Sequence, residues 1–169
     1  MNNINILATK TDEEIKNVAI LANEIWHQHF IPIIGEAQVD YMVEKFQSYP
    51  AISKQIKEDG YEYFRIYFND IFAGYTGVHA EENSLFLSKL YIKENCRGNH
   101  LATHALNFLI QLCKERGLKK IWLTCNKYNA NTLAIYDYLG FEITDEQVAD
   151  IGNGFVMDDY ILTYRIEKE

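Results

Sequence analysis

The chain has 169 residues, of which 48% are hydrophobic, and a formal net charge of −8. A chain of this length can bury a full core without disulfides or metals, so we expect one domain over residues 1–169. The acidic balance argues against nonspecific binding to nucleic acid, which needs clustered lysine and arginine. No apolar run approaches the roughly 18 residues that span a membrane, and the first residues lack the pattern of a signal peptide. We therefore expect a cytoplasmic protein that binds neither membranes nor nucleic acid.

Periodicity predicts the elements of the first half of the chain. They are one strand, three helical segments and three strands, at residues 4–8, 12–30, 36–47, 52–58, 61–67, 71–80 and 85–92. Thr11 or Asp12 is placed to cap the first helix. Asn69 and Asp70 are typical of the turn of a hairpin between the second and third strands.

The second half is predicted to add two helices and three strands. We expect a helix over residues 97–116, a buried strand over 119–125, a short helix between Asn129 and Gly140, and a closing hairpin of 141–144 with 155–166. Two strand-plus-helix units in series imply that the strands 85–92 and 119–125 are parallel neighbours. Ligands of such sheets bind at the carboxyl ends of the strands.

The segment from Arg97 enters a helix directly after a strand. A helix start presents unpaired backbone N–H groups and the positive end of the helix dipole, which is a ready anion site. Asn129, which follows the next strand, carries a side-chain amide that can cap a helix or bridge to a ligand. Both segments lie at the same predicted edge of the sheet.

These two segments resemble the signature motifs of the GNAT superfamily of N-acetyltransferases. The family's loop is written as Gln or Arg, two residues, Gly, one residue, then Gly or Ala; Arg97 and Ala102 match its ends, and His100 replaces the middle Gly. The later signature has Asn seven residues before a Tyr, and that Tyr four residues before Gly-Phe. Four residues fit it: Asn129, Tyr136, Gly140 and Phe141. The resemblance covers nearly the whole chain, and the regions around Trp26 and residues 154–160 are similar to bacterial polyamine acetyltransferases.

The resemblance implies an α/β fold in which helices flank a central, twisted, mixed and mostly antiparallel sheet. It also implies acetyl-CoA as co-substrate, with the pyrophosphate on the loop amides and the pantetheine arm along the preceding strand. The implied cofactor-binding residues are Leu90, Tyr91, Ile92, Arg97, Gly98, Asn99, His100, Leu101, Ala102, Thr103 and Asn129. We expect the cofactor site to be retained despite His100, because a helical position 100 would keep its amide available while the imidazole points away. The alternative is a domain with weak or no cofactor binding.

Acetyl transfer to an amine needs an acid for the departing thiolate and a base for the acceptor. The resemblance implies Tyr136 as the acid. Four carboxylates are available as the base, and none is assigned because each is more simply a solvated charge: Glu81, Glu82, Asp158 and Asp159. The implied acceptor pocket includes Trp26, Tyr41 and Asp158, although Trp26 at helical spacing also suits the core. Aromatic rings with a carboxylate suit an alkyl ammonium group.

The leading prediction is direct transfer of the acetyl group of acetyl-CoA to a small amine or polyamine in a ternary complex. Two alternatives stay open: acetylation of a protein N-terminus or lysine, and a nonenzymatic acyl-CoA-binding regulatory module. His100 and His104 are four residues apart, but no third ligand accompanies them, so no metal site is predicted. A homodimer through an edge strand is possible, and nothing in the sequence requires it.

Overall fold

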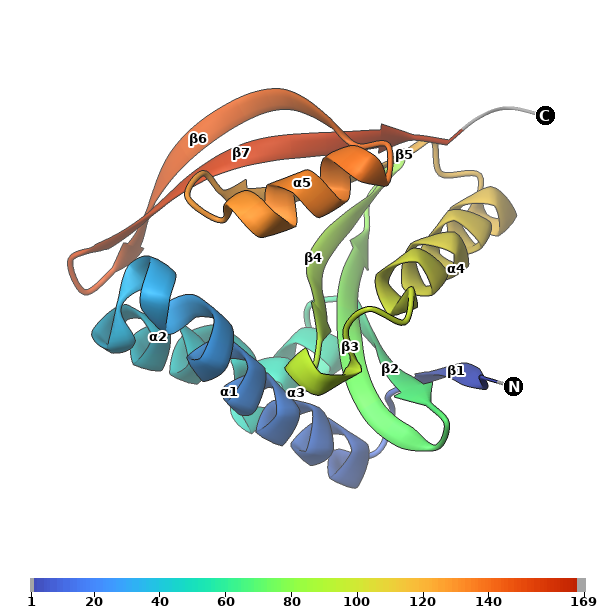
Figure 1. The fold of residues 1–169 in the computed structure, drawn as a ribbon, viewed down its shortest axis with the longest axis horizontal. Coiled ribbons are helices and arrows are strands. Elements are labelled where there is room, and N and C mark those ends of the chain that lie inside the picture. Colours follow the sequence, from blue (N-terminus) through green and yellow to red (C-terminus); the bar gives the residue numbers. More distant parts are fainter. Residues whose placement is uncertain (1, 167–169) are drawn as a thin grey trace. The chain divides into compact units, whose positions relative to one another are not determined.

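The computed structural model describes residues 2–166, which divide into two compact units (Figure 1). The first unit consists of residues 2–79 and 89–108, and the second of residues 80–88 and 109–166. Strand β4 (Ser84–Ile92) begins in the second unit and ends in the first. Helix α4 (Leu101–Arg116) begins in the first unit and ends in the second.

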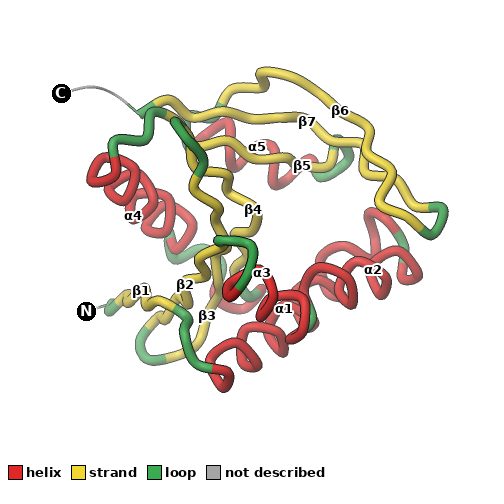
Figure 2. Tube along the Cα trace, turned by 180° about the vertical axis from the view of Figure 1, so that it is seen from behind, coloured by secondary structure: helices red, strands yellow, loops and turns green. Residues whose placement is uncertain are grey.

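The seven strands form one sheet in the order β1-β2-β3-β4-β5-β7-β6 (Figure 2). The other strands are β1 (Ile4–Ala8), β2 (Tyr61–Phe68), β3 (Ile71–Ala80), β5 (Lys120–Asn126), β6 (Glu142–Gly152) and β7 (Phe155–Arg165). Strands β4 and β5 pair in parallel from Ser84–Lys120 to Phe86–Trp122, whereas β1–β2, β2–β3, β5–β7 and β6–β7 are antiparallel. This confirms the predicted mixed, mostly antiparallel α/β sheet flanked by helices.

Four helical segments belong to the first unit: α1 (Asp12–Ile34), α2 (Glu36–Met42), a π-helix (Val43–Gln47) and α3 (Tyr49–Lys57). Thr11, one of the two predicted caps, begins α1: its hydroxyl accepts from Glu14 N, and the Glu14 carboxylate accepts from Thr11 N. This reciprocal capping satisfies two helix-start donors. The core of this unit is made of buried α1, α3 and sheet residues: Ile15, Val18, Leu21, Ala22, Ile25, Ile52, Tyr63 and Tyr75.

Some helix boundaries differ from the prediction for local reasons. Helix α1 continues past Phe30 and through Pro32, which lies in its last turn and removes only one hydrogen bond there. Helix α3 begins three residues earlier than predicted, because the Ser48 hydroxyl accepts from Ala51 N and Pro50 suits a first helical turn. The prediction that a helix begins near Arg97 is wrong by four residues, since α4 begins at Leu101.

The second unit places helix α5 (Ala130–Tyr138) on one face of its strands. Ile121, Leu123 and Cys125 alternate as buried residues of β5, as predicted. Tyr136 of α5 packs edge-on against Phe141, at a ring distance of 5.1 Å. Strand β6 is much longer than the predicted residues 141–144, so β6 and β7 form a long antiparallel hairpin. No helix in the described part of the chain combines the length and hydrophobicity that crossing a membrane requires.

Candidate active site

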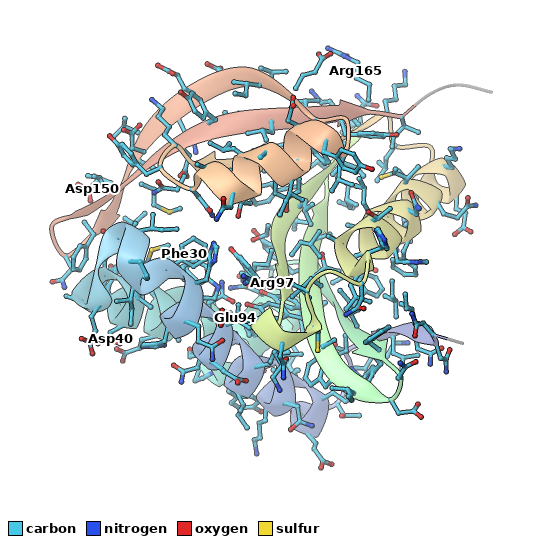
Figure 3. The ribbon with its side chains drawn as sticks, in the orientation of Figure 1. Phe30, Asp40, Glu94, Arg97, Asp150 and Arg165 are labelled. Carbon is cyan, nitrogen blue, oxygen red and sulfur yellow. The ribbon has the colours of Figure 1, made fainter. Side chains whose placement is uncertain are left out.

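The turn between β4 and α4 is shaped by its own polar groups (Figure 3). A short 3-10 helix (Glu94–Cys96) follows β4, with Cys96 N donating to Lys93 O at 2.9 Å. The Arg97 Nε donates to Ile92 O at 3.2 Å, and the Asn99 side-chain amide donates to Cys96 O at 2.9 Å. These bonds fix the turn without using the backbone donors that follow it.

Six consecutive backbone N–H groups after this turn have no acceptor in the part of the chain that the structure describes. The first helical hydrogen bond of α4 runs from His104 N to His100 O at 3.0 Å, and within residues 2–166 nothing accepts from the amides of residues 98–103. Gly98 has a φ of +83°, which turns the chain into this arrangement. Unpaired amides at the start of a helix of this length form a site for an anion such as a phosphate.

The expectation that position 100 is already helical is wrong. His100 precedes α4 and has a φ of +60°, in the left-handed region that glycine adopts without strain. Histidine is among the few non-glycine residues enriched in that region. His100 therefore takes a backbone conformation that glycine would adopt without strain. The imidazole is exposed.

The end of β4 lies close against β3 at Gly74. A Cβ atom at Gly74 would lie 2.4 Å from the carbonyl oxygen of Tyr91 and 3.2 Å from Ile92 Cα, so only glycine fits. Lys93 N donates to Ala73 O at 2.7 Å and continues this contact. Beneath the turn, Ile92 packs on a buried cluster of Ala73, Cys96 and Leu101. The main chain from Leu90 to Ile92 is thus fixed in the same unit as the loop 97–103.

Tyr91 joins an aromatic cluster on the helix side of the sheet. Its ring contacts the rings of Trp26 at 5.5 Å and Phe30 at 6.0 Å, and Trp26 and Phe30 lie 4.3 Å apart. Trp26 is buried, which agrees with the core alternative for this residue. Tyr41 on α2 is half-buried, with its hydroxyl 3.2 Å from Lys45 Nζ.

Sequence reasoning missed Lys89, a buried lysine on β4 directly before Leu90. Its side chain is 6% exposed, and its Nζ donates to Phe46 O at 3.1 Å, to Gln55 Oε1 at 2.8 Å and to the Tyr63 hydroxyl. Burial lowers the pKa of Lys89 to about 7. The signal was present in the sequence, because Lys89 is the one charged residue in residues 85–92, otherwise mostly apolar.

The second unit contains the remaining predicted residues. Tyr136 is buried, and burial, followed by the nearby Cys125, raises its pKa well above the usual value, which keeps the hydroxyl protonated. Asn129 begins α5, and of the two roles predicted for its side chain, a cap or a bridge to a ligand, the cap does not form. Asp158 on β7 lies 3.0 Å from Lys127 Nζ.

The predicted residues fall into two groups. Leu90, Tyr91, Ile92 and the loop 97–103 share the first unit with Trp26 and Tyr41, whereas Asn129, Tyr136 and Asp158 lie in the second. Cysteine, histidine, aspartate and glutamate side chains form no group of three or more that could hold a metal ion within residues 2–166.

Comparison with known proteins identifies the family of this chain. The model of the acetyltransferase (GNAT) family matches residues 22–141, well over half of the chain. The chain belongs to the GNAT acetyltransferase family. It is therefore an acetyl-CoA-dependent N-acetyltransferase, and transfer of an acetyl group to an amine is the general chemistry of this family.

Solved structures of GNAT proteins share the fold. The PaiA N-acetyltransferase from Thermoplasma acidophilum, solved in complex with coenzyme A, superposes with a TM-score of 0.80 at 16% identity, covering 96% of this chain and 99% of that one. A probable acetyltransferase from Staphylococcus epidermidis gives 0.73 at 18% identity, with coverages of 99% and 100%. The ribosomal-protein-S18-alanine N-acetyltransferase from Escherichia coli gives 0.68 at 17% identity, with coverages of 100% and 96%.

Proposed function

We propose that this GNAT enzyme acetylates the amine of a small cationic acceptor, an alkyl amine or polyamine. The observation that carries the proposal is the charge of the β6–β7 hairpin. Residues 142–165 contain six carboxylates and a single cation, Arg165. An acidic surface raises the local concentration of a polycation and speeds its encounter with the protein. The net charge of −8 acts in the same direction.

The loop before α4 is the proposed cradle for the pyrophosphate of acetyl-CoA. The amides of residues 98–103, which have no acceptor within residues 2–166, are available to an anion, and the helix dipole of α4 favours its negative charge. Arg97, exposed at the same turn, adds a positive charge. The proposed cofactor contacts of this loop are Arg97, Gly98, Asn99, His100, Leu101, Ala102 and Thr103.

The pantetheine arm is proposed to pair with the main chain of Leu90, Tyr91 and Ile92. The close approach at Gly74 fixes this backbone, so an extended ligand would meet preformed donors and acceptors. Asn129 is proposed to contact the same arm, and this role is supported by its side chain, which does not cap α5.

Transfer is proposed to occur directly within a ternary complex. The acceptor nitrogen loses a proton and attacks the thioester carbon, and a backbone N–H near Leu90 stabilises the oxyanion. Tyr136 then donates its hydroxyl proton to the departing thiolate. The raised pKa of Tyr136 is compatible with this role, because the hydroxyl is protonated at neutral pH and has a proton to donate.

Acceptor contacts are proposed for Trp26, Tyr41 and Asp158. The aromatic rings of Trp26 and Tyr41 can cover an alkyl ammonium group. Asp158 already holds Lys127, and it can exchange this partner for a ligand cation.

The test is the release of free CoA thiol from acetyl-CoA with a panel of acceptors: spermidine, spermine, short diamines, amino acids and N-terminal peptides. We expect turnover with the polyamines and diamines. Tyr136→Phe should lower kcat by about 100-fold or more while leaving acetyl-CoA affinity unchanged, because the phenyl ring keeps the packing on Phe141.

Two results would contradict the proposal. Turnover with peptides alone would show that the acceptor is a protein and not a small amine. Tight acetyl-CoA binding by calorimetry, with no turnover on any acceptor, would favour an acyl-CoA-binding regulatory module.

A further inference from the structure

Asp159 on β7 is a buried carboxylate without a partner. Its side chain is 1% exposed, and its Oδ1 is fully shielded from solvent. Within residues 2–166 this Oδ1 atom has no hydrogen-bond partner. A buried charge of this kind costs free energy unless a cation or several donors compensate it. The chain keeps this cost at a residue that no packing role requires to be charged.

Lys127, the cation whose charge acts on Asp159, is already paired with other carboxylates. Lys127 Nζ lies 3.0 Å from Asp158 Oδ1 and 3.3 Å from Glu146 Oε2, and Lys127 N donates to Asp158 O at 3.1 Å. Lys127 is therefore shared by two neighbouring carboxylates and leaves Asp159 unpaired. Three carboxylates, those of Glu146, Asp158 and Asp159, thus share one cation, which leaves two negative charges unbalanced at this point.

Asp159 also lies at the end of the sheet where the chemistry is proposed. It stands opposite Asn126, the last residue of β5, and carboxyl ends of parallel strands are where ligands bind. Its charge adds to the effect of burial in raising the pKa of the Cys125 thiol, and Cys125 in turn affects the buried Tyr136. The unpaired carboxylate and the proposed proton donor are thus both neighbours of Cys125.

We propose that the Asp159 carboxylate binds the ammonium group of the acceptor and takes the proton that the nitrogen must lose. This inference rests on the proposed amine acceptor, and it names the base that sequence reasoning left unassigned. The positive charge that would balance Asp159 is that of the ligand. The charge of this carboxylate is therefore balanced only when a cationic amine occupies the site.

The protons and electrons balance in this scheme. One N–H bond of the ammonium group breaks, the electron pair stays on nitrogen, and the proton passes to an Asp159 oxygen. The nitrogen then forms a bond to the acetyl carbon, and the C–S bond breaks as the thiolate takes the Tyr136 proton. The second amine proton restores the Tyr136 hydroxyl, and Asp159 releases its proton to water. Each turnover yields one acetamide, one CoA thiol and one proton.

The titration of Asp159 agrees with this role. Burial, reinforced by the charge of Asp158, raises the pKa of Asp159 to about 6, although Lys127 acts in the opposite direction. A carboxylate with a raised pKa is a stronger base than an ordinary one and is still ionised at neutral pH. Cys125, Asp158 and Lys127 are the titratable groups whose charges couple to it.

The experiment compares Asp159→Asn and Asp159→Glu with wild type and with Asp145→Asn. Asp145 is an exposed β6 carboxylate that accepts from Glu146 N, so it controls for the loss of one charge from the same hairpin. We expect Asp159→Asn to lower kcat/KM for the amine by about 100-fold or more, and Asp159→Glu to restore part of it. Asp145→Asn should change kcat/KM by less than about threefold. Acetyl-CoA affinity, measured by calorimetry, should be unchanged in all three variants.

Two further measurements separate this role from a structural one. The wild-type kcat/KM should fall on acidification with an apparent pKa near 6, and this limb should vanish in Asp159→Asn. The midpoint of urea unfolding should not fall in Asp159→Asn, because asparagine keeps the shape and removes the unpaired charge.

The inference is overturned if wild type acetylates amines but Asp159→Asn keeps its activity and its acid limb. It is equally overturned if Asp159→Asn loses activity together with folding stability while Asp159→Glu restores stability alone. A wild-type enzyme that acetylates no amine contradicts the proposed function itself, which is a separate result.

Discussion

The Nζ atom of Lys89 on β4 lies 3.1 Å from the carbonyl oxygen of Phe46 in the π-helix. The Gln55 side-chain amide of α3 donates to the same oxygen at 3.1 Å. One carbonyl at the end of the α2 and π-helix segment is therefore bonded from the strand and from the next helix. This junction fixes the helical segment to the strand that continues into Leu90, Tyr91 and Ile92.

Replacing Lys89 should change how stability depends on pH. The pKa of Lys89 is lowered from 10.5 to about 7 by burial, so between these values the unfolded chain binds more protons than the folded one. Stability therefore rises with pH across this window, by about 1.4 kcal/mol per pH unit at most. In Lys89→Met this rise should disappear. Urea unfolding at about pH 7.5 and about pH 9.5 measures it, with the exposed Lys54→Met as control. An equal rise in both variants would contradict the assignment.

His27 is predicted to be an imidazolium ion that connects α1 to α2. Its Nδ1 lies 2.8 Å from the carbonyl oxygen of Asn23 and its Nε2 lies 2.6 Å from Asp40 Oδ1; both partners accept, so both ring nitrogens must donate. Hydrogen bonding to Asp40 accordingly raises the pKa of His27. The stabilisation is complete below about pH 6.5 and is lost as pH rises through the raised folded pKa.

The Asp40→Asn variant tests this connection. Because the pair is partly exposed, we expect a loss of at most about 1 kcal/mol at about pH 6, and no loss at about pH 9. An NMR titration of the His27 ring should show its pKa falling in the variant. In the control Asp59→Asn, which removes a pair with Lys54, the stability change should be the same at both pH values. A His27 pKa that does not move in Asp40→Asn would refute the prediction.

Substitutions at His100 should separate backbone strain from ligand contact. With a φ of +60°, His100→Gly should be at least as stable as wild type, and His100→Ala should be less stable than the glycine variant by about 1 kcal/mol. If the loop binds acetyl-CoA through its amides, the glycine variant should keep the affinity measured by calorimetry. A large loss of affinity in His100→Gly would mean that the imidazole itself contacts the ligand.

Gly74→Ala should damage both the fold and the cofactor site. The new Cβ would meet the Tyr91 carbonyl oxygen at 2.4 Å, so β3 and β4 must separate. We expect a loss of about 1–3 kcal/mol in urea unfolding and weaker acetyl-CoA binding. Ala80→Gly, at the exposed end of the same strand, should cost under about 1 kcal/mol and leave the affinity intact. Normal binding by Gly74→Ala would show that this close approach does not shape the site.

Most of the fold follows from local patterns, whereas parts of the site depend on tertiary structure. Alternating burial in β5, and the Thr11 cap of α1, are readable because period and capping chemistry are local. The left-handed turn at His100 is not readable, because no residue type other than glycine marks it reliably. The burial of Lys89 and Asp159 depends on elements distant in sequence, so a charged residue in a strand looked like an ordinary surface charge.

Strand β6 ends the sheet and pairs with β7 alone. An eleven-residue edge with an unpaired backbone would ordinarily invite another chain to extend the sheet. Four carboxylates are spread along this edge: Glu142, Asp145, Glu146 and Asp150. Two such edges aligned side by side would bring like charges together, so the hairpin repels its own copies at neutral pH. Acid that protonates these carboxylates would remove the repulsion, so self-association of the protein should increase as the pH falls.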